Sequence, residues 1–123
     1  MEIYTLLETI KNIIESGRKI PFTDSKRIVD ETMKKFGKID VLVNNAGVQY
    51  QQDSLECISD EQFDKTMKVN IYGMFYLTRE ALPYMKSGAS IINLSSVTTF
   101  YGDPQLIDYV TTKGAIVGFT RSL

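Results

Sequence analysis

The sequence predicts an α/β fold in which short parallel strands alternate with longer amphipathic helices. Two observations carry this prediction. Tight apolar runs occur at Ile39–Val43 and Ala89–Leu94, and small polar residues follow each run at once. Around them, apolar residues recur every three or four positions, as in helices that bury one face. Because strands that alternate with helices pair in parallel through crossover connections, the pattern favours a layered α/β domain.

The elements expected before the first run are two helices and a short strand. Apolar residues in Met1–Ile14 draw one stripe along an amphipathic helix, which Gly17 ends. The run Lys19–Phe22 suits a short strand. Asp24 can then cap a second helix that reaches Phe36.

Two further helices are expected around the second run. Ser59 or Asp60 can cap a long helix whose apolar stripe continues to Met85. Ala89–Leu94 then forms the second buried strand. The dipeptide Asp103-Pro104 offers a cap and a first-turn proline for a last helix that runs to the C-terminus.

Length and composition limit the class of protein. The 123 residues suffice for a single domain, 1–123, and 14 basic against 15 acidic residues give a net charge of -1, so neither nucleic acid nor a membrane is an expected partner. No apolar run approaches the ~18 residues that span a bilayer. With no histidine and Cys57 as the only cysteine, we expect no disulfide, no metal site and a cytoplasmic location.

Tyr109 and Lys113 are the first candidate site residues. They stand four positions apart in Tyr-Val-Thr-Thr-Lys, so on a helix both side chains project from one face. A neighbouring ammonium stabilises a phenolate, which makes tyrosine usable as an acid or base. Taken alone, such a pair is most often ordinary helix surface.

Ser96 lies thirteen residues before Tyr109, at the carboxyl end of the predicted strand Ala89–Leu94. Ligands of open parallel sheets bind at that end, where the serine hydroxyl could donate to a substrate carbonyl. The alternative is a serine that only forms a turn beside its hydroxyl-rich neighbours.

Asn70 stands in the apolar stripe of its helix, between Met67 and Met74. A buried amide without partners costs about 1 to 3 kcal/mol, so Asn70 is expected to bond something specific. A purely structural bond to a neighbouring carbonyl, with a bend in the helix, fits equally well.

Asn44-Asn45-Ala46-Gly47 follows the first predicted strand. Its small residues permit close approach of the backbone to a flat ligand. A plain turn is the alternative for this tetrapeptide.

Together these motifs resemble the short-chain dehydrogenase/reductase family over about Val29–Leu123. Four segments match successive family motifs in order: Asn44-Asn45-Ala46-Gly47, Val69-Asn70, Ile92-Asn93-Leu94-Ser95-Ser96 and Tyr109-Val110-Thr111-Thr112-Lys113-Gly114-Ala115. The chain is further similar to the bacterial glucose/ribitol-type oxidoreductases. The resemblance implies a Rossmann-like, doubly wound three-layer fold.

The resemblance also implies roles for the candidate residues. Tyr109 would be the acid/base, and Lys113 would assist it and bind the nicotinamide ribose. Ser96 would hold the substrate oxygen, and Asn70 would anchor a water relay towards Lys113. The tetrapeptide would form the cofactor-binding cleft, with Asn45, Ala46 and Gly47 lining it and Asn44 steadying the strands.

The same resemblance implies NAD or NADP as cofactor and an alcohol, sugar/polyol or carbonyl as substrate. It also implies a homo-oligomer, either a dimer or a tetramer. The family's glycine-rich turn and first two strands have no counterpart here, because no two of the eight glycines are closer than four positions. We therefore expect an incomplete dinucleotide-binding domain, truncated at both ends, with a bare edge on the Ile39–Val43 strand.

Three hypotheses about function follow. The first is an NAD(P)-dependent oxidoreductase with Tyr109 as acid/base. The second is a catalytically inactive remnant that acts only as a helix-mediated interaction module. The third is a frameshifted or incomplete reading of a longer gene. The sequence identifies neither the substrate nor the preferred cofactor.

Overall fold

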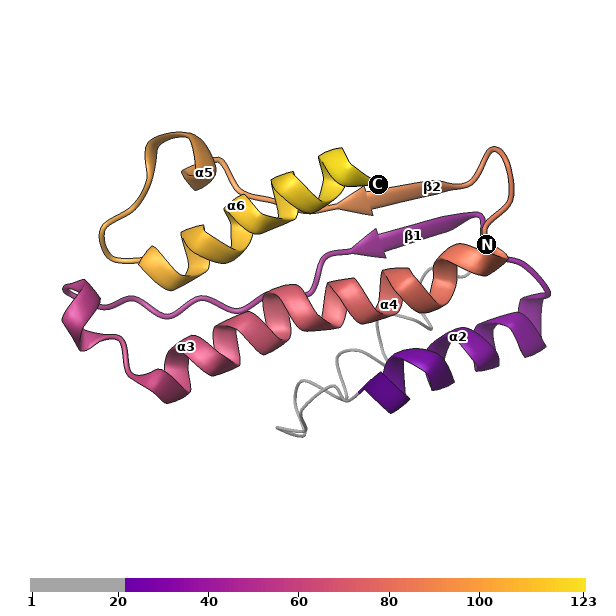
Figure 1. The fold of residues 1–123 in the computed structure, drawn as a ribbon, viewed down its shortest axis with the longest axis horizontal. Coiled ribbons are helices and arrows are strands. Elements are labelled where there is room, and N and C mark those ends of the chain that lie inside the picture. Colours follow the sequence, from indigo (N-terminus) through magenta and orange to yellow (C-terminus); the bar gives the residue numbers. More distant parts are fainter. Residues whose placement is uncertain (1–21) are drawn as a thin grey trace.

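The computed structural model describes residues 22–123, which form a two-stranded sheet with helices beside it (Figure 1). A π-helical turn joins α3 to α4, so these two helices continue as one long helix. The elements in chain order are α2 (Phe22–Phe36), β1 (Val41–Asn44), α3 (Asp60–Met67), the π turn (Lys68–Tyr72), α4 (Gly73–Ala81), β2 (Ser90–Asn93), α5 (Thr98–Tyr101) and α6 (Ile107–Ser122).

The strands β1 and β2 pair in parallel, with Val41 opposite Ser90 and Asn44 opposite Asn93. The predicted α/β class with parallel strands is therefore confirmed. The carboxyl ends of both strands meet at one edge of the sheet, where Leu94 N donates to Asn44 O at 3.0 Å. The segments that follow the two strands thus start side by side.

The hydrophobic core lies between α2, β1 and α4. Its buried members are Ile28 and Val29 from α2, Leu42 from β1, and Leu77 and Ala81 from α4. Helix α2 packs against α4, while α3 and the π turn pack against α6. The continuous helix formed by α3, the π turn and α4 therefore lies between α2 and α6 (Figure 1).

The opposite face of the sheet is open within the described part of the chain. Val41 is 52% exposed and Ile92 is 50% exposed. The expectation that both strands are fully buried is therefore wrong for residues 22–123. The alternation of side chains along a strand gives the reason, because only every second residue faces the helices.

The start of α2 differs from the prediction. The helix begins at Phe22, which was expected to end a strand, and Asp24 lies inside its first turn rather than at its cap. There Asp24 Oδ1 pairs with Arg27 Nη2 at 3.7 Å, and a carboxylate in a first turn also suits the helix dipole. The helix expected in Met1–Ile14 and the strand residues 19–21 lie outside the described residues.

The long helix is capped as predicted. Ser59 Oγ accepts from Gln62 N at 3.1 Å, and α3 starts at Asp60. What the apolar stripe did not indicate is the π turn, in which Gly73 N donates to Lys68 O, five residues back. This turn carries Asn70.

The predicted cap of the last helix is wrong. Asp103 Oδ1 accepts from Gln105 N at 3.0 Å, and Leu106 N donates to Asp103 O at 3.1 Å, so Asp103 and Pro104 form a turn. Helix α6 begins only at Ile107. Its first turn instead contains a buried carboxylate, Asp108.

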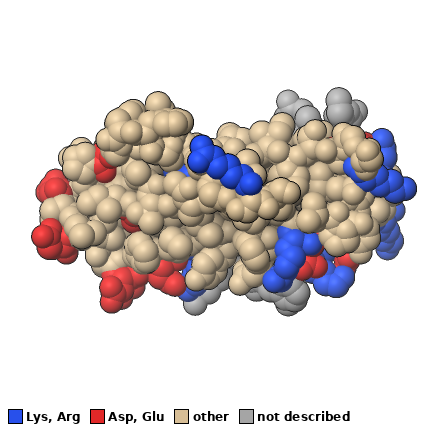
Figure 2. All heavy atoms as spheres, turned by 45° about the horizontal axis from the view of Figure 1, so that its top comes forward, with Lys and Arg blue, Asp and Glu red and all other residues tan. Residues whose placement is uncertain are grey.

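Charged side chains are separated along the surface in Figure 2. Acidic side chains gather at one end of that face, basic side chains gather towards the other end, and the mostly uncharged middle carries a basic side chain at its upper edge. The acidic end matches the region that leads into α3, where Asp53, Glu56 and Asp60 are exposed. No helix in residues 22–123 has the length and apolar character needed to span a bilayer.

Candidate active site

The segments after β1 and β2 and the first half of α6 enclose a cleft of about 260 Å³. Tyr109 and Lys113 line it from α6, and Ser95 lines it from the end of β2. Asn45 and Gly47 contribute from the end of β1. The remaining lining residues are Val48, Gln49 and Leu94.

Tyr109 and Lys113 lie side by side on α6, one turn apart. Lys113 Nζ is 5.6 Å from the centre of the Tyr109 ring. The i, i+4 spacing thus brings the phenol and the ammonium to one cleft, as expected from the helical period. The Tyr109 hydroxyl has no hydrogen-bond partner within residues 22–123, so its oxygen is open to a ligand.

Lys113 is fixed at both ends by the segment that follows β2. Its Nζ donates to Leu94 O at 2.8 Å, and its own carbonyl accepts from Ser95 Oγ at 2.8 Å. The side chain is buried, and this burial lowers the pKa of the Lys113 ammonium below its ordinary value. The ammonium is therefore held at the wall of the cleft.

Asn70 is fully buried and bonded on every side. Its Oδ1 accepts from Val48 N at 2.8 Å, and its Nδ2 donates to Val48 O at 3.0 Å and to Thr112 Oγ1 at 2.9 Å. The amide expected to find specific partners therefore joins the β1 loop to α6. These bonds also agree with the structural alternative, because one of them reaches a backbone carbonyl from within a distorted turn.

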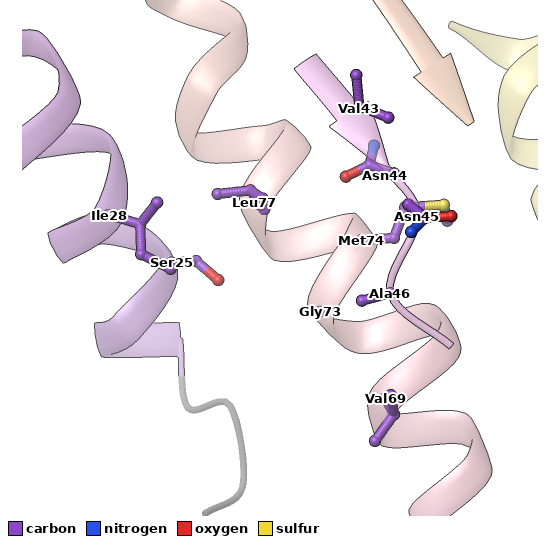
Figure 3. A pocket seen from close by; sticks show the side chains of 10 residues that line it. All are labelled: Ser25, Ile28, Val43, Asn44, Asn45, Ala46, Val69, Gly73, Met74 and Leu77. Atoms are coloured by element: carbon purple, nitrogen blue, oxygen red, sulfur yellow. The ribbon is translucent and has the colours of Figure 1, made fainter. Parts of the chain in front are cut away.

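The tetrapeptide Asn44-Asn45-Ala46-Gly47, which starts at the last residue of β1, divides between two cavities. Asn45 and Gly47 line the cleft, whereas Ala46 faces a smaller cavity of about 40 Å³ between α2 and α4, which Asn44 and Asn45 also line (Figure 3). Asn44 Nδ2 donates to Asn93 Oδ1 at 2.7 Å and to Thr78 Oγ1 at 3.0 Å. Asn44 thus links the two strands.

Ser96 lies next to the cleft but does not line it, whereas its neighbour Ser95 does. The Ser96 hydroxyl accepts from Thr98 N at 3.2 Å and from Thr98 Oγ1 at 2.9 Å. Both bonds belong to the turn that starts α5. The Ser96 hydroxyl therefore takes part in this turn, and within residues 22–123 it donates no hydrogen bond of its own.

Asp108 is a buried residue of this region that sequence reasoning missed. Its Oδ2 accepts from Gln62 Nε2 at 3.1 Å and from Thr66 Oγ1 at 2.8 Å, and its Oδ1 accepts from Tyr109 N at 2.8 Å. These bonds attach the first turn of α6 to α3. The available signal was Thr66, a polar residue one turn before Asn70 on the same helix.

Two features of the cleft suit the nicotinamide cofactor that the resemblance implies. Gly47 adds no side chain to the wall, and a Cβ there would lie 3.5 Å from both Asn70 Oδ1 and Lys113 Nζ. One N–H of Lys113 is bonded to Leu94 O, and the other two have no partner among the described residues. They suit ribose hydroxyls. Within residues 22–123, no three metal-ligating side chains gather into a candidate site.

Residues 21–123 match the family model described as short chain dehydrogenase. The chain is 43% identical over 126 residues to NADPH-dependent aldehyde reductase 1, chloroplastic, of Arabidopsis thaliana. The alignment covers 95% of this chain and 44% of that protein.

Solved structures give the same picture. The crystal structure of a short-chain dehydrogenase/reductase from Brucella melitensis, a glucose/ribitol dehydrogenase, matches with a TM-score of 0.78 and 37% identity. The match covers 83% of this chain and 43% of that one. A 3-ketoacyl-(acyl-carrier-protein) reductase from Brucella melitensis, complexed with NADH, matches with a TM-score of 0.78 and 32% identity, over 83% and 45%. The chain spans 33–44% of the length of the curated relatives it matches.

Proposed function

This chain belongs to the short-chain dehydrogenase family, and on that premise we propose that it carries the proton-transfer site of an NAD(P)-dependent oxidoreductase. The observation that carries the proposal is the shared cleft of Tyr109 and Lys113, with Lys113 Nζ 5.6 Å from the Tyr109 ring centre. The substrate is an alcohol, a sugar or polyol, or a carbonyl compound.

Tyr109 exchanges a proton with the substrate oxygen. In oxidation its phenolate accepts the hydroxyl proton of the substrate, and in reduction its phenol donates a proton to the carbonyl oxygen. The Lys113 ammonium beside the ring stabilises the phenolate, because opposite charges attract strongly where little water separates them. The hydroxyl of Tyr109, unbonded within residues 22–123, supports this role.

The remaining residues orient the reactants. From the family resemblance, Ser96 is assigned the bond to the substrate oxygen from beside the cleft, and Asn70 is assigned the support of a water relay that ends at Lys113. Asn45 and Gly47 form the wall on which the cofactor lies, while Ala46 and Asn44 shape that loop from the other side. A bound nicotinamide supplies the hydride donor or acceptor that these side chains lack.

The names of the relatives support this substrate class. They include an NADPH-dependent aldehyde reductase and a glucose and ribitol dehydrogenase. Solved relatives were obtained with NADH and with NADP, which supports a nicotinamide cofactor without choosing between the two forms. A single exposed thiol, Cys57, supports a reducing location such as the cytoplasm.

The test is nicotinamide-dependent turnover of a panel of sugars, polyols, secondary alcohols and aldehydes by the 123-residue chain. Tyr109→Phe removes only the hydroxyl and is expected to abolish turnover. Tyr84→Phe makes the same change at an exposed tyrosine that does not line the cleft, and it serves as the matched control. Turnover that survives Tyr109→Phe would contradict the assigned acid/base.

One alternative is also favoured by a specific observation. Phe75 on α4 and Phe119 on α6 lie with ring centres 6.0 Å apart, and Tyr72 and Phe75 are exposed. Such a surface suits a homo-oligomer interface, or the interaction module expected of an inactive chain. Calorimetry with NAD and with NADP separates the oxidoreductase from the interaction module, because micromolar binding by this chain contradicts a purely structural role.

A further inference from the structure

Thr112 stands between Tyr109 and Lys113 on α6, but it does not line the cleft. Its side chain is fully buried. Its hydroxyl donates to the backbone carbonyl of Tyr109 at 2.7 Å and accepts from the side-chain amide of Asn70 at 2.9 Å. Thr112 therefore joins the turn of α6 that carries Tyr109 to the π turn that carries Asn70.

The direction of each bond is fixed by the groups that form it. A backbone carbonyl can only accept, so the single proton of the Thr112 hydroxyl goes to Tyr109 O. The hydroxyl oxygen can then only accept from Asn70, which turns the Nδ2 end of that amide towards α6. The Oδ1 end is left for Val48 N, from which it accepts at 2.8 Å. The four groups thus form one directional chain of hydrogen bonds.

This chain of bonds joins the two walls of the cleft. Val48 and its neighbour Gly47 line the cleft from the loop after β1, whereas Tyr109 lines it from α6. Asn70 and Thr112 connect the two walls, and both are fully buried. A hydrogen bond in the interior is electrostatically stronger than one exposed to water, so the loop and α6 are held firmly at one separation.

We infer that Thr112 is a positioning residue, which sets the place of Tyr109 relative to the loop that carries Gly47. This inference rests on the proposed function, in which Tyr109 exchanges a proton and Gly47 lines the cofactor wall. An acid/base must lie within hydrogen-bond reach of the substrate oxygen, and a misplacement of about 1 Å can cost up to about 10²-fold in rate. Thr112 itself touches neither substrate nor cofactor.

Thr111 gives a matched comparison on the same helix. Its hydroxyl also donates to a backbone carbonyl of α6, that of Ile107, at 2.7 Å. Thr111 is exposed, and within residues 22–123 its hydroxyl bonds to no other element. Thr111→Val and Thr112→Val therefore remove the same kind of bond to the helix backbone, but only Thr112→Val also breaks the link to Asn70.

Hydrogen exchange tests this link without turnover and without a bound ligand. The Val48 N–H is bonded to Asn70 Oδ1, so its exchange rate reports how firmly Asn70 is held. Thr112→Val is expected to speed this exchange about fivefold, the effect of one lost hydrogen bond. Thr112→Ser is expected to restore the original rate, and Thr111→Val is expected to leave it unchanged.

A second amide separates the loss of this link from a general loss of stability. Ser90 N donates to Asp40 O at 2.9 Å, where β2 begins, and the segments after the strands lie at the other end of the sheet. In Thr112→Val, exchange at Ser90 is expected to change less than exchange at Val48. Equal acceleration at the two amides would indicate general destabilisation alone and would overturn the inference.

Steady-state kinetics then test the role of Thr112 in catalysis. Thr112→Val is expected to lower kcat about tenfold, whereas Thr112→Ser recovers kcat and Thr111→Val leaves it unchanged. The pH profile of kcat is expected to stay in place, because Tyr109 and Lys113 lie on one helix and keep their mutual geometry. A shifted pH profile would mean that Thr112 acts on the proton affinity of Tyr109 instead of its position, which overturns the inference.

Failure of the variant to fold has its own remedy. If Thr112→Val does not fold, judged by its circular dichroism, Thr112→Ala removes the same hydroxyl and takes its place. In the unmodified chain, the side-chain N–H protons of Asn70 are expected to exchange more slowly than those of the exposed Asn45. Equal rates for these two side chains would overturn the inference without any variant.

The outcomes separate the two proposals. An active chain whose kcat is unchanged in Thr112→Val overturns the role of Thr112 and leaves the proposed function standing. A chain without turnover towards any substrate of the panel overturns the proposed function, and the role of Thr112 with it.

Discussion

The side-chain amide of Asn70 and the backbone of Val48 form a reciprocal pair of hydrogen bonds. Oδ1 accepts from Val48 N at 2.8 Å, and Nδ2 donates to Val48 O at 3.0 Å. This is the pattern that an adjacent strand would offer, supplied here by one side chain across 22 positions of sequence. It fixes the loop that carries Gly47 against the helix that carries Asn70.

Asn70→Asp is expected to destabilise the chain by about 1–3 kcal/mol, because the variant has no donor for Val48 O or Thr112 Oγ1. A carboxylate oxygen would instead oppose the Val48 carbonyl. Urea unfolding measures the difference. Asn45→Asp, at an exposed asparagine of the same loop, is the control, and equal stability of the two variants would argue against the pair as a stabilising contact.

Asp108→Asn is expected to cost about 1–3 kcal/mol as well, for the opposite reason. The carboxylate accepts from Gln62, Thr66 and the Tyr109 N–H, so an amide would turn a donor towards at least one donor. Asp103→Asn is the matched control, since an asparagine oxygen can still accept from Gln105 N. Thermal unfolding of the two variants decides, and a smaller loss at Asp108 would be inconsistent with this network.

Lys113→Met is expected to change how stability depends on pH. Burial lowers the folded-state pKa of Lys113, so between that pKa and the ordinary value of 10.5 the unfolded chain binds more protons than the folded chain. The contribution of Lys113 to stability therefore increases as pH rises through this window and is lost as pH falls through it. The variant lacks this dependence.

The measurement is the difference in free energy of unfolding between Lys113→Met and the unmodified chain, from neutral pH to about pH 10. This difference should move in favour of the unmodified chain as pH rises. Lys86→Met replaces an exposed lysine in the same way and controls for the lost charge. A difference for Lys113→Met that is flat across the range, or that moves the other way, would refute the expectation.

Gly47→Ala is expected to weaken nicotinamide binding by about tenfold, equivalent to ~1.4 kcal/mol, while the fold is retained. The added methyl would lie 3.5 Å from Asn70 Oδ1 and Lys113 Nζ, an ordinary contact distance, so it fills cleft space without a clash. Calorimetry with NAD and NADP gives the affinities. Gly118→Ala, on the far part of α6 with no atom within 4 Å of the new methyl, should bind like the unmodified chain.

Local patterns predicted the parts of the site that lie on one element. The i, i+4 spacing placed Tyr109 and Lys113 in one cleft, and Ser59 capped α3 as expected. The wrong predictions also concern single elements, since Asp24 and Asp103 have the residue type of a cap but accept other bonds. A capping residue type fits both a cap and a turn, so type alone does not choose between them.

The sequence by itself determined the α/β class, the order of the motifs and the family, because these depend on residue types at short, fixed spacings. Only the tertiary structure decided that Asn70 bonds Val48, that Asp108 bonds Thr66, and that β1 leaves Val41 exposed. Such contacts join positions 22 to 42 residues apart or depend on which neighbour covers a face. The physical reason is that helical and strand periods repeat over a few residues, whereas the partner of a buried polar group is set by how whole elements pack.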